Sequence, residues 1–336
     1  MKQFGVGVAI AGSGSATPTA KLTNEQLSQV VETSDEWIQS RTGMRERRVA
    51  TVEESLCSLS VQASQKAIEA AQIPKEAIDL VILATSTPDD LFGSAAKIAH
   101  QVGATHAVAF DLTAACSGFV FGMVTAAQYI RTGVYQNVLL IGADVLSRWV
   151  DWSDRSTCVL FGDGAGAVVL RADETRDRLL GFELCSDGTQ NHTLTLAFQG
   201  ETKPLVDEVN AKLGNYQPIT MNGREVYRFA VAKVPEVISK ALFRANLTAS
   251  DIDWLLLHQA NQRIMDAVAQ RLKLPSEKVI SNIAKYGNTS AASIPLALDE
   301  AVRDGKVKVG DRIAASGFGA GLTWGAVIFE WGINNG

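Results

Sequence analysis

A cysteine at the predicted start of a helix is the residue in this sequence best placed to act as a nucleophile. Cys116 lies in the segment DLTAACSGF (111–119), between small residues that leave room for a substrate, namely Ala114, Ala115, Ser117 and Gly118. The thiolate is the reactive form of cysteine, and the oriented backbone N–H groups at a helix N-terminus favour it. The alternative is a structural role, because cysteine is among the residue types most often buried.

A histidine and an asparagine stand at comparable places further along the chain. His258 directly follows the apolar segment 254–257, where a histidine can donate a hydrogen bond or carry a proton. Asn288 lies in YGNTSAAS (286–293), ahead of another predicted helix. Structural roles stay open for both, since His258 could be a core histidine satisfied by its neighbours and Asn288 an ordinary N-cap.

Two glycine-rich segments, 162–166 and 317–321, superficially look like phosphate-binding loops. Neither matches a Walker loop, and neither opens a dinucleotide-binding fingerprint after the first strand. We predict tight turns with exposed backbone N–H groups, one of which could stabilise an oxyanion.

The remaining cysteines, Cys57, Cys158 and Cys185, are widely scattered and show neither a CxxC pair nor a Cys/His spacing typical of zinc. We expect reduced, structural thiols and no metal site.

Three pairs of similar segments, in the same order, indicate an internal duplication. Each pair shares a pattern: a helix end, loop and apolar strand; a helix ending in arginine and glycine; or a strand after a glycine-rich turn. Chance similarity explains one such match easily but three ordered matches poorly. The pairs are 67–83 with 241–257, 116–133 with 288–305, and 166–170 with 325–329.

The duplication predicts an α/β fold of two similar halves, residues 1–176 and 177–336, each with a mixed, mainly parallel sheet covered by helices. No Pro/Ser-rich linker separates them, so we expect tight packing. In this alignment Cys116 and Asn288 are equivalent, and His258 takes the place of Ala84. Sites in parallel α/β folds gather at the carboxyl ends of strands and at helix N-termini, so the three side chains should converge between the halves.

The composition excludes several classes of protein. The 336 residues are 46% hydrophobic and 20% charged, with a formal net charge of −5 and no Lys/Arg run, which argues against nucleic-acid binding. The apolar runs, such as those within 78–84 and 138–143, are too short to span a bilayer and fit buried strands. The N-terminus lacks the pattern of a signal peptide, so we expect a cytoplasmic protein without membrane insertion.

A set of motifs in one order closely resembles the β-ketoacyl-[acyl-carrier-protein] (ACP) synthase III family of thiolase-superfamily condensing enzymes. Any one of them would be weak, but together they span nearly the whole chain. The motifs are TSDEWIQSRTGMRERR (33–48), FDLTAACSGF (110–119), DWSDRST (151–157), FGDGAGA (161–167), HQANQRI (258–264), GNTSAAS (287–293) and GFGAGLTWG (317–325).

The resemblance implies a thiolase-like fold and a site for each step of a condensation. Cys116, His258 and Asn288 inherit the roles of a catalytic triad, and asparagine as third member favours the CoA-primed branch over elongating synthases with a second histidine. The implied oxyanion donors are backbone N–H groups of Cys116, Gly319 and Ala320. The implied CoA site has adenine between Trp37 and Arg155 and phosphates near Arg41, and its residues are Thr33, Trp37, Arg41, Arg155, Gly223 and Asn261.

The resemblance also implies partners and a reaction. A CoA-bound acyl primer, acetyl-CoA by default, is condensed with malonyl-ACP, and no cofactor is required. The enzyme is expected to be a homodimer in which Phe92 forms a primer-pocket wall across the interface. ACP, which is acidic, is expected to dock on Arg228, Arg263 and Arg271.

Two segments depart from the family pattern: the run 319–321 is Gly-Ala-Gly, and 190–220 is longer and matches poorly. Three other functions stay open. They are a polyketide- or quinolone-type condensing enzyme with a different primer, a non-catalytic acyl-CoA-binding relative, and a nucleotide-binding oxidoreductase suggested by the glycine-rich segments.

Overall fold

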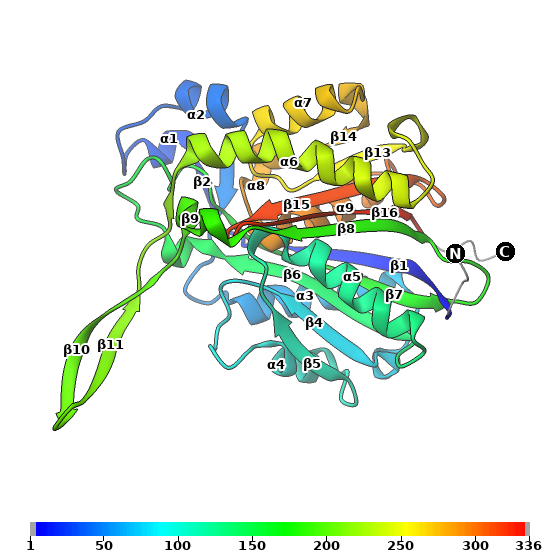
Figure 1. Ribbon diagram of the computed structural model, residues 1–336, viewed down its shortest axis with the longest axis horizontal. Coiled ribbons are helices and arrows are strands. Elements are labelled where there is room, and N and C mark those ends of the chain that lie inside the picture. The colour runs from blue at the N-terminus through cyan, green and yellow to red at the C-terminus, as the bar shows by residue number, and fades with distance from the viewer. Residues whose placement is uncertain (1–4, 333–336) are drawn as a thin grey trace.

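Two five-stranded sheets form the centre of the molecule (Figure 1). The computed structural model describes residues 5–332. The first sheet runs in the order β1 (Gly7–Ala16), β7 (Asp163–Asp173), β6 (Asn137–Val145), β4 (Leu80–Ala84), β5 (Val108–Leu112). The second runs in the order β8 (Leu179–Ser186), β16 (Thr323–Glu330), β15 (Arg312–Gly319), β13 (Trp254–Leu257), β14 (Val279–Ile280). Every strand of one sheet thus has a counterpart at the same place in the other, which confirms the predicted duplication.

The sheets are evenly mixed, and our expectation of mainly parallel sheets was wrong. β4 is parallel to β5 and β6, whereas β7 is antiparallel to β1 and β6. The second sheet repeats the pattern around β13 and β16. The connections explain the difference. A parallel neighbour needs a crossover, but β15 and β16 are joined by residues 320–322 alone, which permits only a hairpin.

Helices cover both sheets and fill the space between them. α3 (Leu56–Ala70) and α4 (Ala95–Val102) pack against the first sheet, and α6 (Gly223–Arg244) packs against the second. α5 (Gly118–Arg131) and α9 (Ser293–Arg303) contact strands of both sheets. Most residues of both helices are buried, as expected for a middle layer between two sheets.

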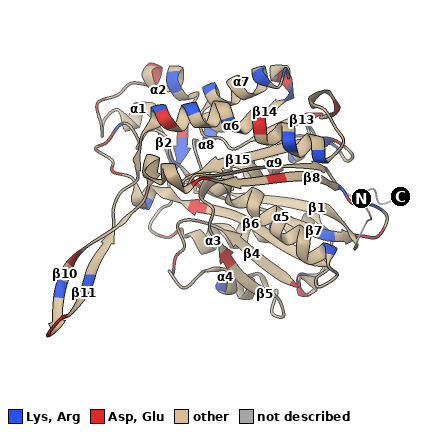
Figure 2. Ribbon diagram, in the orientation of Figure 1, with Lys and Arg blue, Asp and Glu red and all other residues tan. Residues whose placement is uncertain are grey.

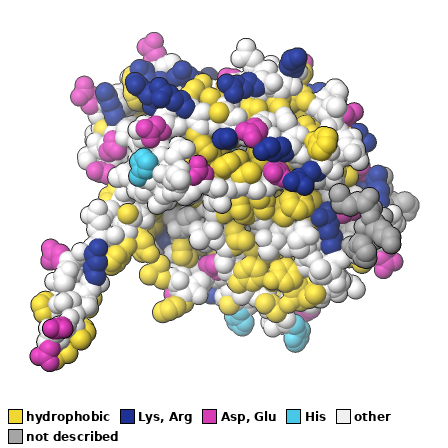
Figure 3. All heavy atoms as spheres, in the orientation of Figure 1, with side chains coloured by type: hydrophobic (Ala, Val, Ile, Leu, Met, Phe, Trp, Pro, Cys, Tyr) yellow, Lys and Arg dark blue, Asp and Glu magenta, His cyan; other side chains and the backbone are white. Residues whose placement is uncertain are grey.

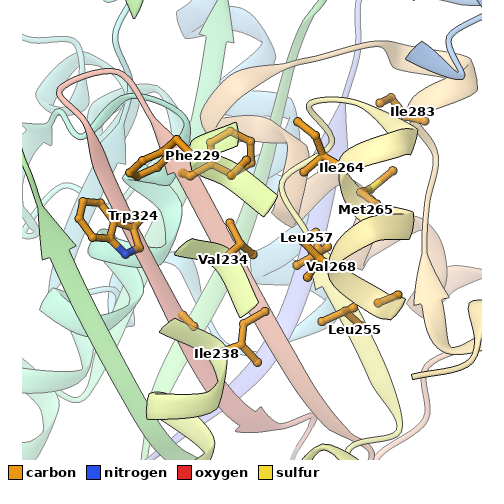
Figure 4. Close-up of a cluster of buried hydrophobic side chains, with 14 of the residues drawn as sticks. Phe229, Val234, Ile238, Leu255, Leu257, Ile264, Met265, Val268, Ile283 and Trp324 are labelled. Atoms are coloured by element: carbon orange, nitrogen blue, oxygen red, sulfur yellow. The ribbon is translucent and has the colours of Figure 1, made fainter. Parts of the chain in front are cut away.

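The outer cluster of the second half reaches toward the site. α7 (Gln262–Arg271) packs Ile264, Met265 and Val268 over β13, while Phe229 of α6 meets Trp324 edge-on at 5.0 Å between ring centroids (Figure 4). This packing fixes α6 and α7 relative to the sheet, and both helices contribute residues to the site described below.

The packing around Gly166 explains why a segment that we predicted to be a tight turn belongs to a strand. The segment 162–166 lies mostly within β7, not in a tight turn as we expected. A Cβ at Gly166 would lie 2.7 Å from the backbone nitrogen of Leu296, so glycine allows α9 to lie directly on the strand.

Short elements and one long hairpin complete the chain. The short elements are β2 (Lys21–Thr23), α1 (Asn24–Leu27), α2 (Asp35–Thr42), β3 (Glu46–Arg48), β9 (Leu194–Thr195), β12 (Thr220–Met221) and α8 (Ile283–Tyr286). The poorly matching stretch forms the hairpin of β10 (Phe198–Val206) and β11 (Val209–Tyr216), which projects from the body in Figure 1. Its tip exposes Leu205, Val206 and Val209.

The two halves are joined beyond their shared helices, because Ile10 of β1 forms a bridge with Trp331. This bridge does not locate a boundary between the halves, and the one between residues 176 and 177 stays a prediction. None of the helices within residues 5–332 is long and apolar enough to cross a membrane.

Candidate active site

One cavity of about 680 Å³ brings Cys116, His258 and Asn288 together. Their exposed fractions are 7%, 2% and 7%, so all three lie at its buried end. Cys116 comes from the turn before α5, His258 from the residue after β13, and Asn288 from the loop after α8. The predicted convergence is thus present in the structure.

Cys116 and Asn288 are not equivalent in the duplication, contrary to our alignment. Cys116 is the middle residue of a 3₁₀ turn, 115–117, whose counterpart is the turn 290–292. The turns are 175 residues apart (115 to 290), but the last residues of α5 and α9 are 172 apart (131 to 303). α9 is three residues shorter than α5, 11 against 14, and the sequence comparison aligned the helix ends. Asn288 therefore precedes its turn by two residues.

The turn holds Cys116 in a fixed and constrained position. Ala115 has a φ of 47°, in the left-handed region that non-glycine residues seldom adopt. Burial raises the pKa of the Cys116 thiol to about 12, although the Ser290 side chain and a backbone N–H lower it in part. The helix start thus does not outweigh desolvation, and in this state the thiol keeps its proton at neutral pH.

His258 is a neutral imidazole whose position is fixed by a neighbouring hydroxyl and an aromatic ring. Burial lowers its pKa to about 3, so the ring carries one proton at neutral pH. Its Nδ1 lies 2.7 Å from the Ser293 hydroxyl, and the Phe318 ring meets it edge-on at 5.4 Å. The ring can therefore donate or accept one hydrogen bond in the cavity, depending on its tautomer.

Asn288 is also oriented by its neighbours. Its Oδ1 accepts the backbone N–H of Ser290 at 2.8 Å, and its own backbone pairs with Leu160 and Gly162. With the oxygen engaged, the Nδ2 amide is the group available as a donor.

Gly319 lies against Cys116. A Cβ there would be 2.6 Å from the Cys116 nitrogen and 2.9 Å from the Ala115 Cβ, so only glycine fits. Gly319 ends β15 and lines the cavity, whereas Ala320 does not line it. Of the two predicted second oxyanion positions, Gly319 thus lines the cavity next to Cys116.

The outer end of the cavity is lined by cations and an aromatic ring. The guanidinium carbons of Arg41 and Arg155 lie 4.6 and 5.3 Å from the Trp37 ring centroid. Asn261 caps α7 and donates to the carbonyl of Arg41 at 3.0 Å, and Arg263 lies over Tyr227. Gly223 lines this end as well. Basic residues recur on α2, α6 and α7 in Figure 2, and Figure 3 shows them gathered on one side of the surface.

The remaining predicted site residues do not line this cavity. Phe92 is fully exposed in the loop before α4, and Arg228 and Arg271 are exposed on α6 and α7. Thr33 precedes α2, and its buried hydroxyl has no hydrogen-bond partner in the described chain. Among residues 5–332 no cluster of His, Cys, Asp or Glu could hold a metal ion, and the four cysteines are free.

Family models match both halves of the chain. The model "3-oxoacyl-[acyl-carrier-protein (ACP)] synthase III" matches residues 110–188, and its C-terminal companion matches residues 242–331. The β-ketoacyl-[acyl-carrier-protein] synthase III of Microcystis aeruginosa is 70% identical over 99% of this chain and 100% of its own. That of a Synechocystis strain is 65% identical over 98% and 100%. The chain belongs to the β-ketoacyl-ACP synthase III family.

Solved structures agree with this assignment of the synthase. The 3-oxoacyl-ACP synthase III of Aquifex aeolicus is 44% identical, covers 97% of this chain and 100% of its own, and superposes with a TM-score of 0.88. The priming β-ketosynthase of the R1128 polyketide pathway is 33% identical, covers 99% and 98%, and has a TM-score of 0.89. The synthase is thus an acyltransferase with a thiolase-like fold.

A buried carboxylate that we did not predict from the sequence, Asp144, joins segments of both halves next to the synthase's site. Asp144 on β6 is fully buried, and its Oδ1 accepts from Ser86 N (2.8 Å), Thr87 Oγ1 (3.0 Å) and Thr85 Oγ1 (3.1 Å). Its Oδ2 accepts the N–H of Ala291 at 3.1 Å, in the turn after Asn288. An aspartate inside the apolar strand 137–145 was the available signal, since a buried charge needs several partners.

Proposed function

We propose that this synthase transfers an acyl primer from CoA to Cys116 and condenses it with malonyl-ACP to begin fatty acid synthesis. The observation that carries the proposal is the single cavity in which a buried thiol meets two side-chain donors, His258 and Asn288. A thiol and two donors are what a covalent acyl intermediate and an enolate require. The primer is acetyl-CoA by default.

The first half-reaction forms a thioester on Cys116. Its sulfur attacks the acyl-CoA carbonyl, backbone N–H groups of Cys116 and Gly319 stabilise the oxyanion, and the C–S bond to CoA breaks. Because burial keeps Cys116 protonated before the substrate binds, its proton leaves during this step and ends on the CoA sulfur.

The second half-reaction makes and uses a carbon nucleophile. The malonyl thioester carbonyl accepts hydrogen bonds from His258 and Asn288, and the C–C bond to the carboxylate breaks with loss of CO2. Its electron pair forms the enolate, which those donors stabilise. The enolate carbon attacks the acyl carbon, the C–S bond to Cys116 breaks, and β-ketoacyl-ACP forms. The released Cys116 sulfur takes up a proton from solvent, which restores the thiol.

The outer end of the cavity is proposed to bind CoA. Of the residues at this end, Gly223 and Asn261 would contact the middle of CoA, Arg41 its phosphates, and Trp37 and Arg155 its adenine. Thr33 does not line the cavity and would contact the part of CoA that extends outside it. Stacking on both faces of a base needs a spacing of about 7 Å, twice the van der Waals contact distance. Arg155 is 5.3 Å from Trp37, so it must move away for the base to enter.

The synthase is further proposed to be a cytoplasmic homodimer that needs no cofactor. Within residues 5–332, β5 pairs only with β4, so this edge of the first sheet is open, and Val108 on it is exposed. The fully exposed Phe92 lies in the loop before α4 and would reach a partner's site. An open edge with exposed apolar side chains favours pairing with a second copy.

Intact-mass spectrometry after incubation with a panel of acyl-CoAs tests the function. We expect one acyl adduct per chain and an equimolar burst of CoA, followed by turnover with malonyl-ACP. Preference for a primer other than acetyl, or for malonyl-CoA over malonyl-ACP, would favour a polyketide- or quinolone-type enzyme. Binding of acyl-CoA without an adduct would indicate a non-catalytic relative.

A further inference from the structure

The contact behind His258 involves a residue that the mechanism above does not use. Ser293 is the first residue of α9, and only 1% of it is exposed. Its Oγ lies 2.7 Å from Nδ1 of His258, and the backbone N–H of Gln259 donates to the same Oγ at 3.4 Å.

Hydrogen-bond accounting decides which of these groups donates. A serine hydroxyl has one hydrogen and two lone pairs, and the N–H of Gln259 can only donate. If Ser293 gives its hydrogen to Nδ1, every polar group of this contact has a partner. If Nδ1–H donated instead, the Ser293 hydrogen would lack an acceptor within residues 5–332, and an unpartnered buried hydroxyl is destabilising.

We infer that Ser293 is a positioning residue that fixes His258 as the tautomer with its hydrogen on Nε2. This inference rests on the proposed function, in which the ring donates to the malonyl thioester. The ring is neutral at neutral pH, so it holds one hydrogen on its nitrogens. When Nδ1 accepts the hydrogen bond from Ser293, that hydrogen must be on Nε2. A fixed Nε2–H makes His258 a permanent donor to the enolate and prevents it from acting as a base toward Cys116.

Spectroscopy of the side chain tests the lock without relying on activity. The chain has four histidines, so long-range ¹H–¹⁵N spectra of protein labelled in its histidine rings are tractable, and the His258→Ala variant assigns the signal. We expect wild-type His258 to carry its hydrogen on Nε2. A hydrogen on Nδ1 would overturn the inference even if every variant were inactive.

Variants then test the consequence. Ser293→Ala should give a mixture of tautomers and slow malonyl-ACP decarboxylation by roughly 10-fold or more, as a wrong tautomer costs catalysis. The CoA burst from acyl-CoA and the KM for malonyl-ACP should change little, and Ser293→Thr, which keeps the hydroxyl, should restore both tautomer and rate. Ser64→Ala is the matched control, because Ser64 is a fully buried helical serine on α3.

Two results would count against the inference. One is Ser293→Ala retaining a pure Nε2–H ring and full decarboxylation, and the other is an equal loss in Ser64→Ala. Failure of the proposed function would be recognised separately, because wild-type enzyme would then show neither burst nor decarboxylation whatever its tautomer.

Discussion

The two ends of the cavity are built differently. At the buried end, Cys116, His258 and Asn288 are each almost fully enclosed and are held by backbone or buried side chains. At the outer end, Arg41, Arg155 and Arg263 are exposed, and their guanidinium groups rest on aromatic rings.

This difference separates chemistry from recognition. Groups that stabilise a transition state must be preorganised, and burial with satisfied hydrogen bonds provides that. Exposed long side chains can bind a charged substrate and move aside as it enters. Substitution of any one of them therefore weakens binding only slightly. We therefore expect substitutions to have large effects on rate at the buried end and modest effects on KM at the outer end.

The largest effect is expected from Cys116→Ala. It should abolish both the acyl adduct and condensation, because no other thiol lines the cavity. Cys158→Ala, which removes another fully buried thiol, should keep both activities. If intact-mass spectrometry still detects an acyl adduct in Cys116→Ala, the nucleophile is not at the buried end.

His258→Ala and Asn288→Ala should each slow malonyl-ACP decarboxylation by roughly 10²-fold or more, the scale for a lost oxyanion donor. Primer transfer to Cys116 should fall less, since backbone N–H groups serve that step. The two half-reactions are measured separately, as CO2 release and as the CoA burst. An equal loss in both would contradict this division of roles.

Gly319→Ala should reduce acylation by roughly 10-fold or more through the contact of its new Cβ with the turn that carries Cys116. The CoA burst measures this effect. Gly188→Ala is the control, because a Cβ there meets nothing within 4 Å. Wild-type acylation in Gly319→Ala would show that the turn is not held as tightly as the structure indicates.

Outside the cavity, Arg228→Glu should raise the KM for malonyl-ACP several-fold at low salt and leave acylation nearly intact. Arg263→Glu should also raise this KM, but it is the less clean test, because Arg263 lines the end of the cavity proposed to bind CoA. Local positive charge must overcome the repulsion from the net charge of −5, and at physiological salt that repulsion is screened beyond about 8–10 Å. Wild-type KM should rise with salt, and the variants should respond less. Lys308→Glu is the control, since Lys308 precedes β15 and the far end of that strand reaches the cavity. If both reversals leave malonyl-ACP kinetics unchanged, ACP docks elsewhere.

The smallest effect on decarboxylation is expected from a change of pH. His258 has a pKa of about 3 in the folded protein and about 6.5 when unfolded, so decarboxylation should not titrate with it between pH 8 and 5.5. Stability behaves differently. The unfolded histidine takes up a proton below about pH 6.5 while the folded one does not, so the free energy of unfolding falls as the pH drops toward 3. His258→Asn should show less of this loss in urea titrations at several pH values.

The sequence predicted the residues of the buried end better than their geometry. Cys116, His258 and Asn288 all stand beside apolar segments, and such patterns predict strand and helix ends. The alignment of Cys116 with Asn288 failed because α9 is three residues shorter than α5, which local similarity does not reveal. The strand 166–170 was predicted, but its start at Asp163 was missed, because Gly166 serves the packing of α9, a contact distant in sequence.

Ser293 and the hairpin 198–216 show two further limits. Ser293 looks like any serine near a helix start, and its contact with His258 spans 35 residues of sequence. The hairpin has no counterpart in the motifs, and in the described part of the chain its strands pair only with each other, so nothing in the repeated unit predicts it.

Asp144 has a consequence for how the protein opens. Its carboxylate holds the amide of Ser86, after β4, and the amide of Ala291, in the turn of the other half. Neither amide can exchange its hydrogen with solvent while that buried carboxylate keeps its partners, and freeing either one disturbs the other. Hydrogen exchange at these two positions, 205 residues apart (86 to 291), should therefore be equally slow and report a single opening event that involves both sheets.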